Sequence, residues 1–239
     1  MMSGEQPSII KIDFKDVRKS RQKTNNLVVY QNIIEKNFSM FDNNINKLAF
    51  ERVLEDLNFT REQFFIECER NHPLCKVVSM HISKCASRQG CKDEDMQLKT
   101  CNYVTSKYGI KIENLSATAI RPTKDGRILL AKDLKMEKIP KDQCLKSFDG
   151  LLTGRLEGYI AAKVCMSGGG HQDNVFEEMD NIAEWWTKFK SNSSDKLLIL
   201  IDTDLHSKFT IIKNKHINQT NILVFNHVEF QEYIMHNYS

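Results

Sequence analysis

The chain has 239 residues, 41% of them hydrophobic and 27% charged, which is the composition of an ordinary water-soluble globular protein. This length suffices for one domain with a full core, or for one domain with a small appendage. There is no apolar run of roughly 18 residues and no signal-peptide pattern at the start, so we expect no membrane span and a cytoplasmic location. The net charge of only +3 means that nucleic-acid binding would depend on local clusters of basic residues.

The seven cysteines form no CxxC pair, and without an export signal we expect no disulfides. Reduced and mostly buried thiols are the prediction. Five cysteines nevertheless share one region with two histidines: Cys68, Cys75, Cys85, Cys91 and Cys101, with His72 and His81. A zinc site there stays open as an alternative, although the spacings match no common ligand pattern.

Residues 1–80 are predicted to form a helical N-terminal layer, packed beside a core of residues 80–239 in a single domain of residues 1–239. Helices are expected at residues 16–36 and 46–57, where apolar side chains recur at helical spacing. A third helix is expected from Thr60, which begins a capping-box pattern with Gln63, to about Arg70.

A polar loop at residues 85–92 leads into a helix expected at 93–107, which Gly109 ends. The acidic residues that open this helix have two interpretations. They either stabilise the helix dipole or include a functional residue, Glu94, that faces an active site. In the second case the loop would contact DNA, because Arg and Gln pair with base edges and Lys suits a phosphate. The candidate contacts are Ser87, Arg88, Gln89 and Lys92.

Two hairpins follow. Strands at 110–120 and 127–131 are joined through a turn at Asp125-Gly126, and strands at 145–152 and 156–166 fold about Gly154. The second hairpin carries Asp149 on one strand and Lys163 on the other. We therefore expect these two side chains to converge on one ion or one phosphate group.

The remaining chain predicts a layered α/β arrangement. A glycine-rich loop, Gly168-Gly169-Gly170-His171-Gln172, precedes an amphipathic helix at 174–190. A buried strand is expected at 196–202, further strands at 209–212 and 221–225, and a closing helix at 228–237. The fold class is thus α/β, with a mixed central sheet flanked by helices and a helical N-terminal layer.

The order helix, three strands, helix, strand, with Asp149 and Lys163 on the central hairpin, resembles the PD-(D/E)xK nuclease superfamily. Within it, residues 80–230 look like a type II restriction endonuclease with an αβββαβ core. The SRQG segment before the first helix and the GGGHQDN segment after the lysine strand add to the likeness. Two positions depart from the pattern: Phe148 stands where the family has proline, and Ala161 where it has an acid.

The resemblance implies a Mg²⁺-dependent, sequence-specific endonuclease of a restriction–modification system that cuts double-stranded DNA as a homodimer. Asp149 and an acid at the position of Ala161 would bind the metal, with Glu94 in support, and Lys163 would orient water and stabilise the phosphate. DNA contacts would come from the loops: Ser87, Arg88, Gln89, Lys92, His171 and Gln172.

Three explanations of Ala161 remain open. A Glu→Ala change leaves a protein that holds DNA without cutting it, or Glu177 or Glu178 supplies a displaced carboxylate from the following helix. In the third, the chain is a natural pseudo-nuclease that only binds DNA or RNA. A rival from another class is an α/β scaffold whose glycine-rich loop, Gly168 to Gly170, binds a nucleotide.

Overall fold

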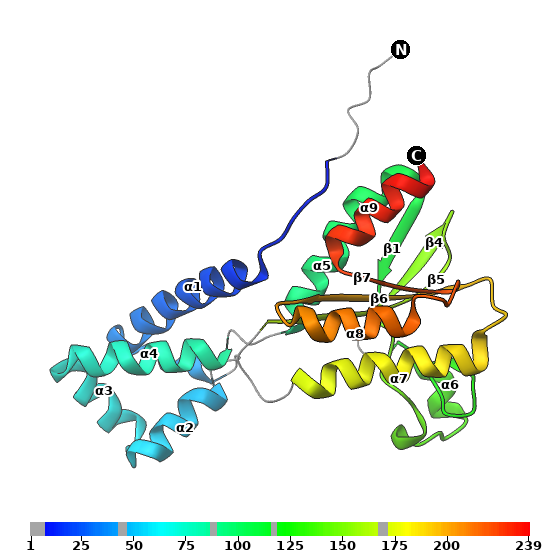
Figure 1. The fold of residues 1–239 in the computed structure, drawn as a ribbon. Coiled ribbons are helices and arrows are strands. Elements are labelled where there is room, and N and C mark those ends of the chain that lie inside the picture. Colours follow the sequence, from blue (N-terminus) through cyan, green and yellow to red (C-terminus); the bar gives the residue numbers. More distant parts are fainter. Residues whose placement is uncertain (1–7, 43–46, 87–89, 116–118, 167–171) are drawn as a thin grey trace. The chain divides into compact units, whose positions relative to one another are not determined.

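The computed structural model describes residues 8–42, 47–86, 90–115, 119–166 and 172–239 (Figure 1). The chain divides into two compact units. Asp13–Gln89 forms the first, called here the helical unit. Met1–Ile12 joins Gly90–Ser239 in the second, called the α/β unit. The division lies at residue 89, nine residues beyond the boundary expected from the sequence.

The helical unit has its own hydrophobic core in the part of the chain that the structure describes. Its helices are α1 (Phe14–Ile34), α2 (Lys47–Leu57), α3 (Arg61–Arg70) and α4 (His72–Ala86), with a short 3-10 helix at Phe38–Phe41. All four α-helices contribute to one buried cluster, for example through Val29, Phe50, Phe64 and Ile82. The predicted capping box is confirmed: Thr60 Oγ1 accepts the Gln63 N–H, and Gln63 Oε1 accepts the Thr60 N–H.

The α/β unit is built on a five-stranded mixed sheet in the order β1-β4-β5-β6-β7. β1 with β4 and β4 with β5 are antiparallel, whereas β5 with β6 and β6 with β7 are parallel. The strands are β1 (Ile110–Asn114), β4 (Gly150–Gly154), β5 (Gly158–Cys165), β6 (Lys196–Thr203) and β7 (Ile222–Phe225). The predicted α/β class with a mixed sheet and flanking helices is confirmed.

Helices cover both faces of this sheet (Figure 1). They are α5 (Gly90–Thr105), α7 (Gln172–Lys190), α8 (His206–His216) and α9 (His227–Tyr238); the short helix α6 (Ala131–Met136) buries none of its side chains. One hydrophobic cluster joins α7 and α8 to the sheet, through residues such as Trp186 and Phe209. A second cluster joins α5 and α9 to the opposite face, through residues such as Leu98 and Phe230. Strand residues alternate between the two clusters, so Ala161 faces α7 while Ala162 faces α5.

Smaller elements complete the unit. The hairpin expected at Asp125-Gly126 is present as β2 (Ile120–Pro122) paired with β3 (Ile128–Leu130). Short 3-10 helices lie at Ser106–Tyr108 and Lys141–Gln143. The single strand expected at 110–120 is shorter, because β1 ends at Asn114 and the next described strand begins at Ile120.

The strand predicted at residues 209–212 is wrong, because these residues lie in α8. The segment FTII has high β propensity in isolation. Phe209, Ile212 and His216 are the residues that α8 buries, and they recur at intervals of three and four, which places them on one helical face. Packing of this face on the sheet overrides the local propensity.

Glycine positions the central hairpin. β4 runs on to Gly154, so the turn falls one or two residues later than expected, between Gly154 and Gly158. Both glycines have positive φ, +97° and +152°, and a Cβ at either would collide with a backbone carbonyl of a neighbouring strand or turn. The hairpin register consequently depends on these two residues lacking a side chain.

None of the helices in the described part of the chain combines the length and the hydrophobicity that crossing a bilayer requires.

Candidate functional site

Asp149 immediately precedes β4 and is fixed by hydrogen bonds to β5. Its backbone N–H donates to the carbonyl of Ile160 at 2.8 Å, and its Oδ2 accepts the backbone N–H of Ala162 at 2.8 Å. The regular ladder ends at Gly150 opposite Ile160, so continuing the register places Asp149 opposite Ala161. The carboxylate therefore lies at the point where β5 extends beyond its neighbour.

Ala161 and Lys163 belong to that extension of β5. They have the same parity along the strand, which directs both side chains to one face of the sheet. Ala161 is fully buried against α7. Lys163 is about one-fifth exposed, and its Nζ lies 3.2 Å from Glu94 Oε1 on α5 and 4.0 Å from Glu178 Oε2 on α7.

A second lysine completes the group. Lys146, in the segment before β4, places its Nζ 3.6 Å from Asp149 Oδ2 and 3.7 Å from Glu178 Oε2. Three carboxylates and two ammonium groups thus meet where β4 begins, and this set is called the charged cluster below: Glu94, Lys146, Asp149, Lys163 and Glu178. Its members come from α5, the segment before β4, β5 and α7.

Burial shifts the pKa values in the charged cluster. Burial raises the pKa of the Glu94 carboxyl above its usual value; the lysines oppose this effect, and the charge of Asp149 adds to it. Burial lowers the pKa of Lys146, and the nearby Lys163 ammonium also acts to lower it. For Lys163 burial acts in the same downward direction, but the carboxylates of Glu94 and Asp149 outweigh it, and its pKa is raised. Lys163 is therefore held as a positive charge within the cluster.

A pocket of about 190 Å³ opens beside the charged cluster. Lys146 and Glu178 contribute to its wall together with the polar side chains of Asn174 and Asn181. Glu178 is partly exposed, at 39% of its side chain, whereas Lys146, Asp149, Lys163 and Glu94 are all exposed by less than a fifth. Solvent thus reaches the cluster from the side of α7.

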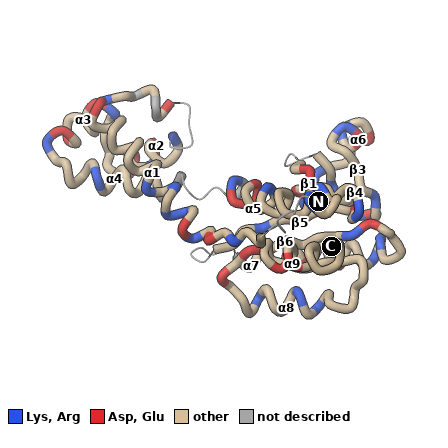
Figure 2. The backbone as a smooth tube through the Cα atoms, turned by 90° about the horizontal axis from the view of Figure 1, so that it is seen from above, with Lys and Arg blue, Asp and Glu red and all other residues tan. Residues whose placement is uncertain are grey.

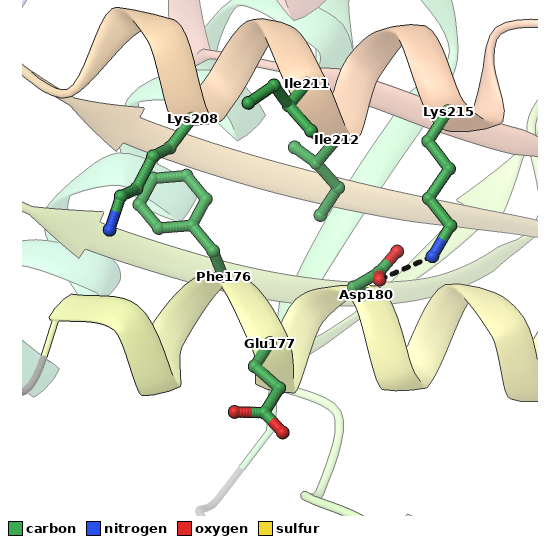
Figure 3. A pocket seen from close by; sticks show the side chains of 7 residues that line it. All are labelled: Phe176, Glu177, Asp180, Lys208, Ile211, Ile212 and Lys215. Carbon is green, nitrogen blue, oxygen red and sulfur yellow. Dashed lines mark hydrogen bonds and ion pairs between the residues drawn. The ribbon is translucent and has the colours of Figure 1, made fainter.

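The two glutamates proposed as displaced acids, Glu177 and Glu178, both line the pocket beside the charged cluster but differ in their contacts. Glu178 contacts both lysines of the charged cluster. Glu177 also lines a second pocket, which has a volume of about 260 Å³ and lies between α7 and α8. In Figure 3 the Glu177 carboxylate points away from α8. The apolar part of that pocket is formed by Phe176, Ile211 and Ile212, and Lys215 donates to Asp180 at 2.6 Å across it.

The sequence predicted Asp149, Lys163 and Glu94, and these three side chains are brought together. Lys146 was missed, because a lone lysine before a strand carries no motif; its position three residues before Asp149 is the one available signal. Lys92 is exposed near the start of α5. Ser87, Arg88, Gln89 and His171 lie outside the described residues, as does the glycine-rich loop at 168–170, and the side chain of Gln172 is not described although α7 begins there.

A Mg²⁺ ion in the charged cluster would require hard oxygen ligands in octahedral geometry. Within the described residues, no group of three or more His, Cys, Asp or Glu side chains is arranged to hold a metal ion. The three carboxylates alternate with the two ammonium groups, and Ala161 offers no oxygen. The residues present therefore do not fit the complete two-carboxylate metal site that the resemblance implies.

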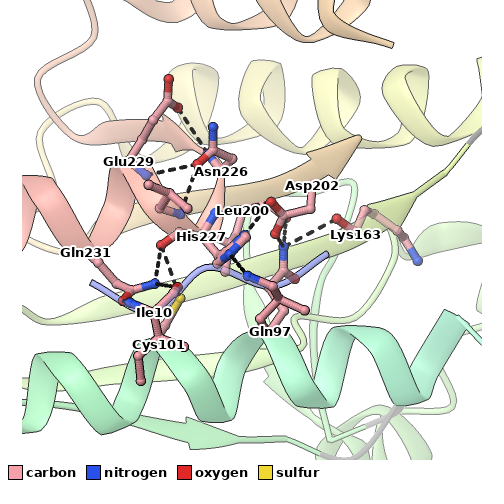
Figure 4. A network of polar contacts seen from close by, with 12 residues as sticks. Ile10, Gln97, Cys101, Lys163, Leu200, Asp202, Asn226, His227, Glu229 and Gln231 are labelled. Carbon is pink, nitrogen blue, oxygen red and sulfur yellow. Dashed lines mark hydrogen bonds and ion pairs between the residues drawn. The ribbon is translucent and has the colours of Figure 1, made fainter. Parts of the chain in front are cut away.

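A second buried polar group lies nearby in the α/β unit, on the α5–α9 side of the sheet (Figure 4). His227 Nδ1 lies 2.6 Å from Asp202 Oδ1, and Asp202 Oδ2 accepts from Gln97 Nε2 at 2.6 Å. The backbone N–H of Ile12 donates to His227 Nε2 at 2.9 Å, which places the ring hydrogen on Nδ1.

Gln231 extends this group to the start of the chain. Its Oε1 accepts the Ile10 N–H at 2.8 Å, and its Nε2 donates to the Ile10 carbonyl at 3.0 Å and to the His227 carbonyl at 2.8 Å. We call these residues the α9 network: Ile10, Ile12, Gln97, Asp202, His227 and Gln231. Asp202, at the end of β6, is thus a buried and hydrogen-bonded residue of the core.

The described cysteines form no disulfide, and all of them except Cys144 are buried. Cys68 and Cys75 lie in the core of the helical unit, where Cys75 Sγ donates to the Cys68 carbonyl at 3.0 Å. Cys101 is buried in the α/β unit, and burial raises the pKa of both Cys68 and Cys101. The side chains of Cys85 and Cys91 are outside the described set, so the proposed zinc alternative is not tested at those two positions.

Comparison with protein-family models, with curated proteins and with solved structures finds no match for this chain.

Proposed function

We propose that this protein binds double-stranded DNA with a type II restriction endonuclease-like core whose phosphodiester-cutting site is one carboxylate short. The observation that carries the proposal is the convergence of Asp149 and Lys163 on the two sides of Ala161, with Glu94 and Glu178 close by. A carboxylate and a lysine at the end of a β-hairpin suit the binding of a cation and a phosphate group.

The order of elements supports the proposal. α5, β1, β4, β5, α7 and β6 follow one another as αβββαβ, interrupted only by the β2–β3 hairpin and short helices. The first three strands of the sheet form an antiparallel meander, and β6 adds in parallel after α7. This is the arrangement that the resemblance implies, with Asp149 immediately before β4 and Lys163 on the central strand β5.

The absence of a carboxylate at Ala161 determines how much DNA cleavage we expect. A glutamate at this position would lie on the same face as Lys163 and opposite Asp149, so it would supply the missing oxygen ligand. Without it, we expect the protein to bind DNA and to cut it slowly or not at all. Mg²⁺ is therefore proposed as a cofactor of the glutamate-containing form, and a DNA- or RNA-binding pseudo-nuclease is the alternative function.

The distribution of charge supports a DNA partner. Residues 11–23 contain six basic and two acidic residues, a net charge of +4, so the other residues together carry −1. Most of this stretch lies in the first half of α1, where Figure 2 marks the basic residues in blue. Lys15, Lys19 and Lys23 are exposed and spaced four apart, so they share one face of the helix. A row of ammonium groups at this spacing suits a phosphate backbone.

Cleavage by an Ala161→Glu variant tests the nuclease part of the proposal. We expect discrete linear products from plasmid DNA with Mg²⁺ and none with the unmodified chain. The matched control is Ala161→Gln, which has the same shape without the charge and should leave the plasmid intact. A second control, Asp149→Asn in the Ala161→Glu background, should abolish cutting. Uncut plasmid from an Ala161→Glu protein that is folded by circular dichroism and still binds DNA would support the pseudo-nuclease instead.

DNA affinity of the unmodified chain tests the partner. Replacing Lys15, Lys19 and Lys23 by Gln should weaken binding to a labelled duplex. It should also lower the slope of log affinity against log salt by roughly 2–3, about 0.9 for each phosphate that the protein no longer neutralises. The matched control removes three exposed lysines of the α/β unit, Lys132, Lys135 and Lys141. Equal losses in the two variants would show that only net charge matters. Light scattering of the free protein and of the complex tests the expected homodimer.

A further inference from the structure

Residues 8–12, which precede α1, are attached to α9 by two side chains of different chemistry. Gln231 is fully buried, and its amide group binds the N–H and the carbonyl of Ile10 at 2.8 and 3.0 Å (Figure 4). His227 is 4% exposed, and its Nε2 accepts the N–H of Ile12 at 2.9 Å. A glutamine amide does not ionise, whereas histidine gains a positive charge between roughly pH 8 and pH 5. The two attachments must therefore respond differently to pH.

The His227 ring has to be neutral while Ile12 is attached to it. A backbone N–H can only donate, so Nε2 must carry the lone pair that accepts it. The ring hydrogen then lies on Nδ1, which is 2.6 Å from Oδ1 of Asp202. A proton added at Nε2 would turn this acceptor into a second donor that faces the N–H of Ile12. The protonated ring and the Ile12 hydrogen bond consequently exclude each other.

The surroundings of the ring favour its protonated form once Ile12 has moved away. Asp202 on β6 is 6% exposed, and its carboxylate would pair with an imidazolium ion across the same 2.6 Å contact. Gln97 on α5 donates to the other carboxylate oxygen at 2.6 Å and keeps it in place. His227 lies in the first turn of α9, where the helix dipole disfavours a positive charge. This dipole amounts to about half a charge, so the full charge of Asp202 outweighs it.

The other titratable groups around His227 in the described part of the chain do not compete for its proton. The Cys101 thiol on α5 lies 3.9 Å from the His227 carbonyl, and burial raises its pKa, so it stays neutral. The remaining groups are an ion pair at the start of α9 and two residues next to Ile12: Glu229 with Lys213 of α8 at 2.8 Å, the exposed Lys11, and Asp13, which caps α1. Asp202 is therefore the carboxylate that acts on the ring.

We infer that His227 is a pH-sensitive attachment point: its neutral ring holds Ile12, and its protonation releases Ile12 and leaves residues 8–12 attached through Gln231. The released state binds one more proton than the attached state, so the attachment is lost as the pH falls and restored as it rises. Ile12 is half-buried, so water can replace the lost acceptor. Because Asp13 is the N-cap of α1, release frees the chain at the entry to the helical unit. The inference is independent of DNA binding and cleavage.

Nuclear magnetic resonance of the full chain between about pH 8 and about pH 5 tests the inference. The nitrogen chemical shifts of the His227 ring should show hydrogen on Nδ1 alone at the higher pH and on both nitrogens at the lower. Over the same range the hydrogen-exchange protection factor of Ile12 should fall by at least about tenfold, since the attached population drops tenfold for each pH unit below the transition. The internal control is Ile112, whose N–H is bound by the uncharged side chain of Asn102 and should stay protected.

Three variants sharpen the test. His227→Gln can accept from Ile12 and donate to Asp202 but does not ionise, so the protection of Ile12 should become independent of pH. Asp202→Asn removes the charge that favours the imidazolium ion, and it should move the loss of protection to lower pH by at least about one unit. The matched control is His236→Gln, which removes an exposed histidine further along α9 and should change neither the size of the loss nor its pH.

Constant protection of Ile12 while the ring becomes doubly protonated would overturn the inference, and so would a ring that stays neutral throughout. Equal losses at Ile12 and Ile112 would do the same, because they would report unfolding of the whole α/β unit. A pH-dependent loss that persists in His227→Gln would assign the effect to another group. If His227→Gln does not fold, the unmodified chain and Asp202→Asn decide the question by the ring shifts and the protection of Ile12.

Discussion

The charged cluster and the α9 network are two buried polar groups in one α/β unit, and they are built in opposite ways. In the α9 network, the hydrogen bonds described above are between 2.6 and 3.0 Å long, and the His227 ring is neutral because its Nε2 accepts the Ile12 N–H. In the charged cluster, five ionisable groups lie 3.2 to 4.0 Å apart, beside a pocket.

This difference separates a structural role from a functional one. Short hydrogen bonds in a buried network favour one conformation, and in the α9 network they leave Gln97 Oε1 as a buried acceptor without a partner among the described residues. Charges that are buried but loosely paired destabilise the folded chain and become useful when a ligand completes them. The charged cluster consists of such loosely paired buried charges. This is why we propose it as the functional site.

The comparison is tested most strongly by removing Asp202. Asp202→Ala leaves the N–H groups of His227 and Gln97 buried without their shared acceptor, so we expect the free energy of unfolding to fall by about 1–3 kcal/mol for each group. Urea denaturation followed by tryptophan fluorescence measures it. The matched change in the charged cluster is Glu178→Gln, for which we expect a change below about 1 kcal/mol because the side chain is partly exposed. Similar losses in the two variants would remove the distinction between the two groups.

A smaller effect is expected from Gln231→Met, which keeps the volume of the side chain. The N–H and carbonyl of Ile10 lose their partners, and we expect a loss of about 1–3 kcal/mol. Hydrogen exchange should be faster at Ile10 and unchanged at Ala162, whose N–H is bound by Asp149 in the charged cluster. Unchanged exchange at Ile10 would contradict the anchoring role of Gln231.

The sequence predicted the elements whose signals are local. The apolar runs in the central hairpin and in β6, the helical spacing in α7 and the capping box before α3 each depend on neighbouring residues. Asp149 and Lys163 were found because the hairpin that joins them is itself local. The segment at residues 209–212 was misread because only the sheet beneath it decides between strand and helix.

The missed features all depend on contacts between distant residues. The place of Lys146 in the charged cluster depends on its contact with Glu178, which lies thirty-two positions later and on another element. The partnership of Gln231 with Ile10 spans 221 positions, and neither residue belongs to a motif. No pattern in the sequence indicates such pairs, because they are set by how the strands and helices are layered.

The connectivity of the two units has a consequence for how this protein is assembled. Residues 8–12 belong to the α/β unit, which the chain leaves after Ile12 and re-enters at Gly90. Topologically, Asp13–Gln89 is an insertion tethered at both ends. If the helical unit partly unfolds, Ile10 and Ile12 on its N-terminal side would still be held by their hydrogen bonds to Gln231 and His227. Replacing Asp13–Gln89 by a short linker would therefore remove the whole helical unit in a single deletion.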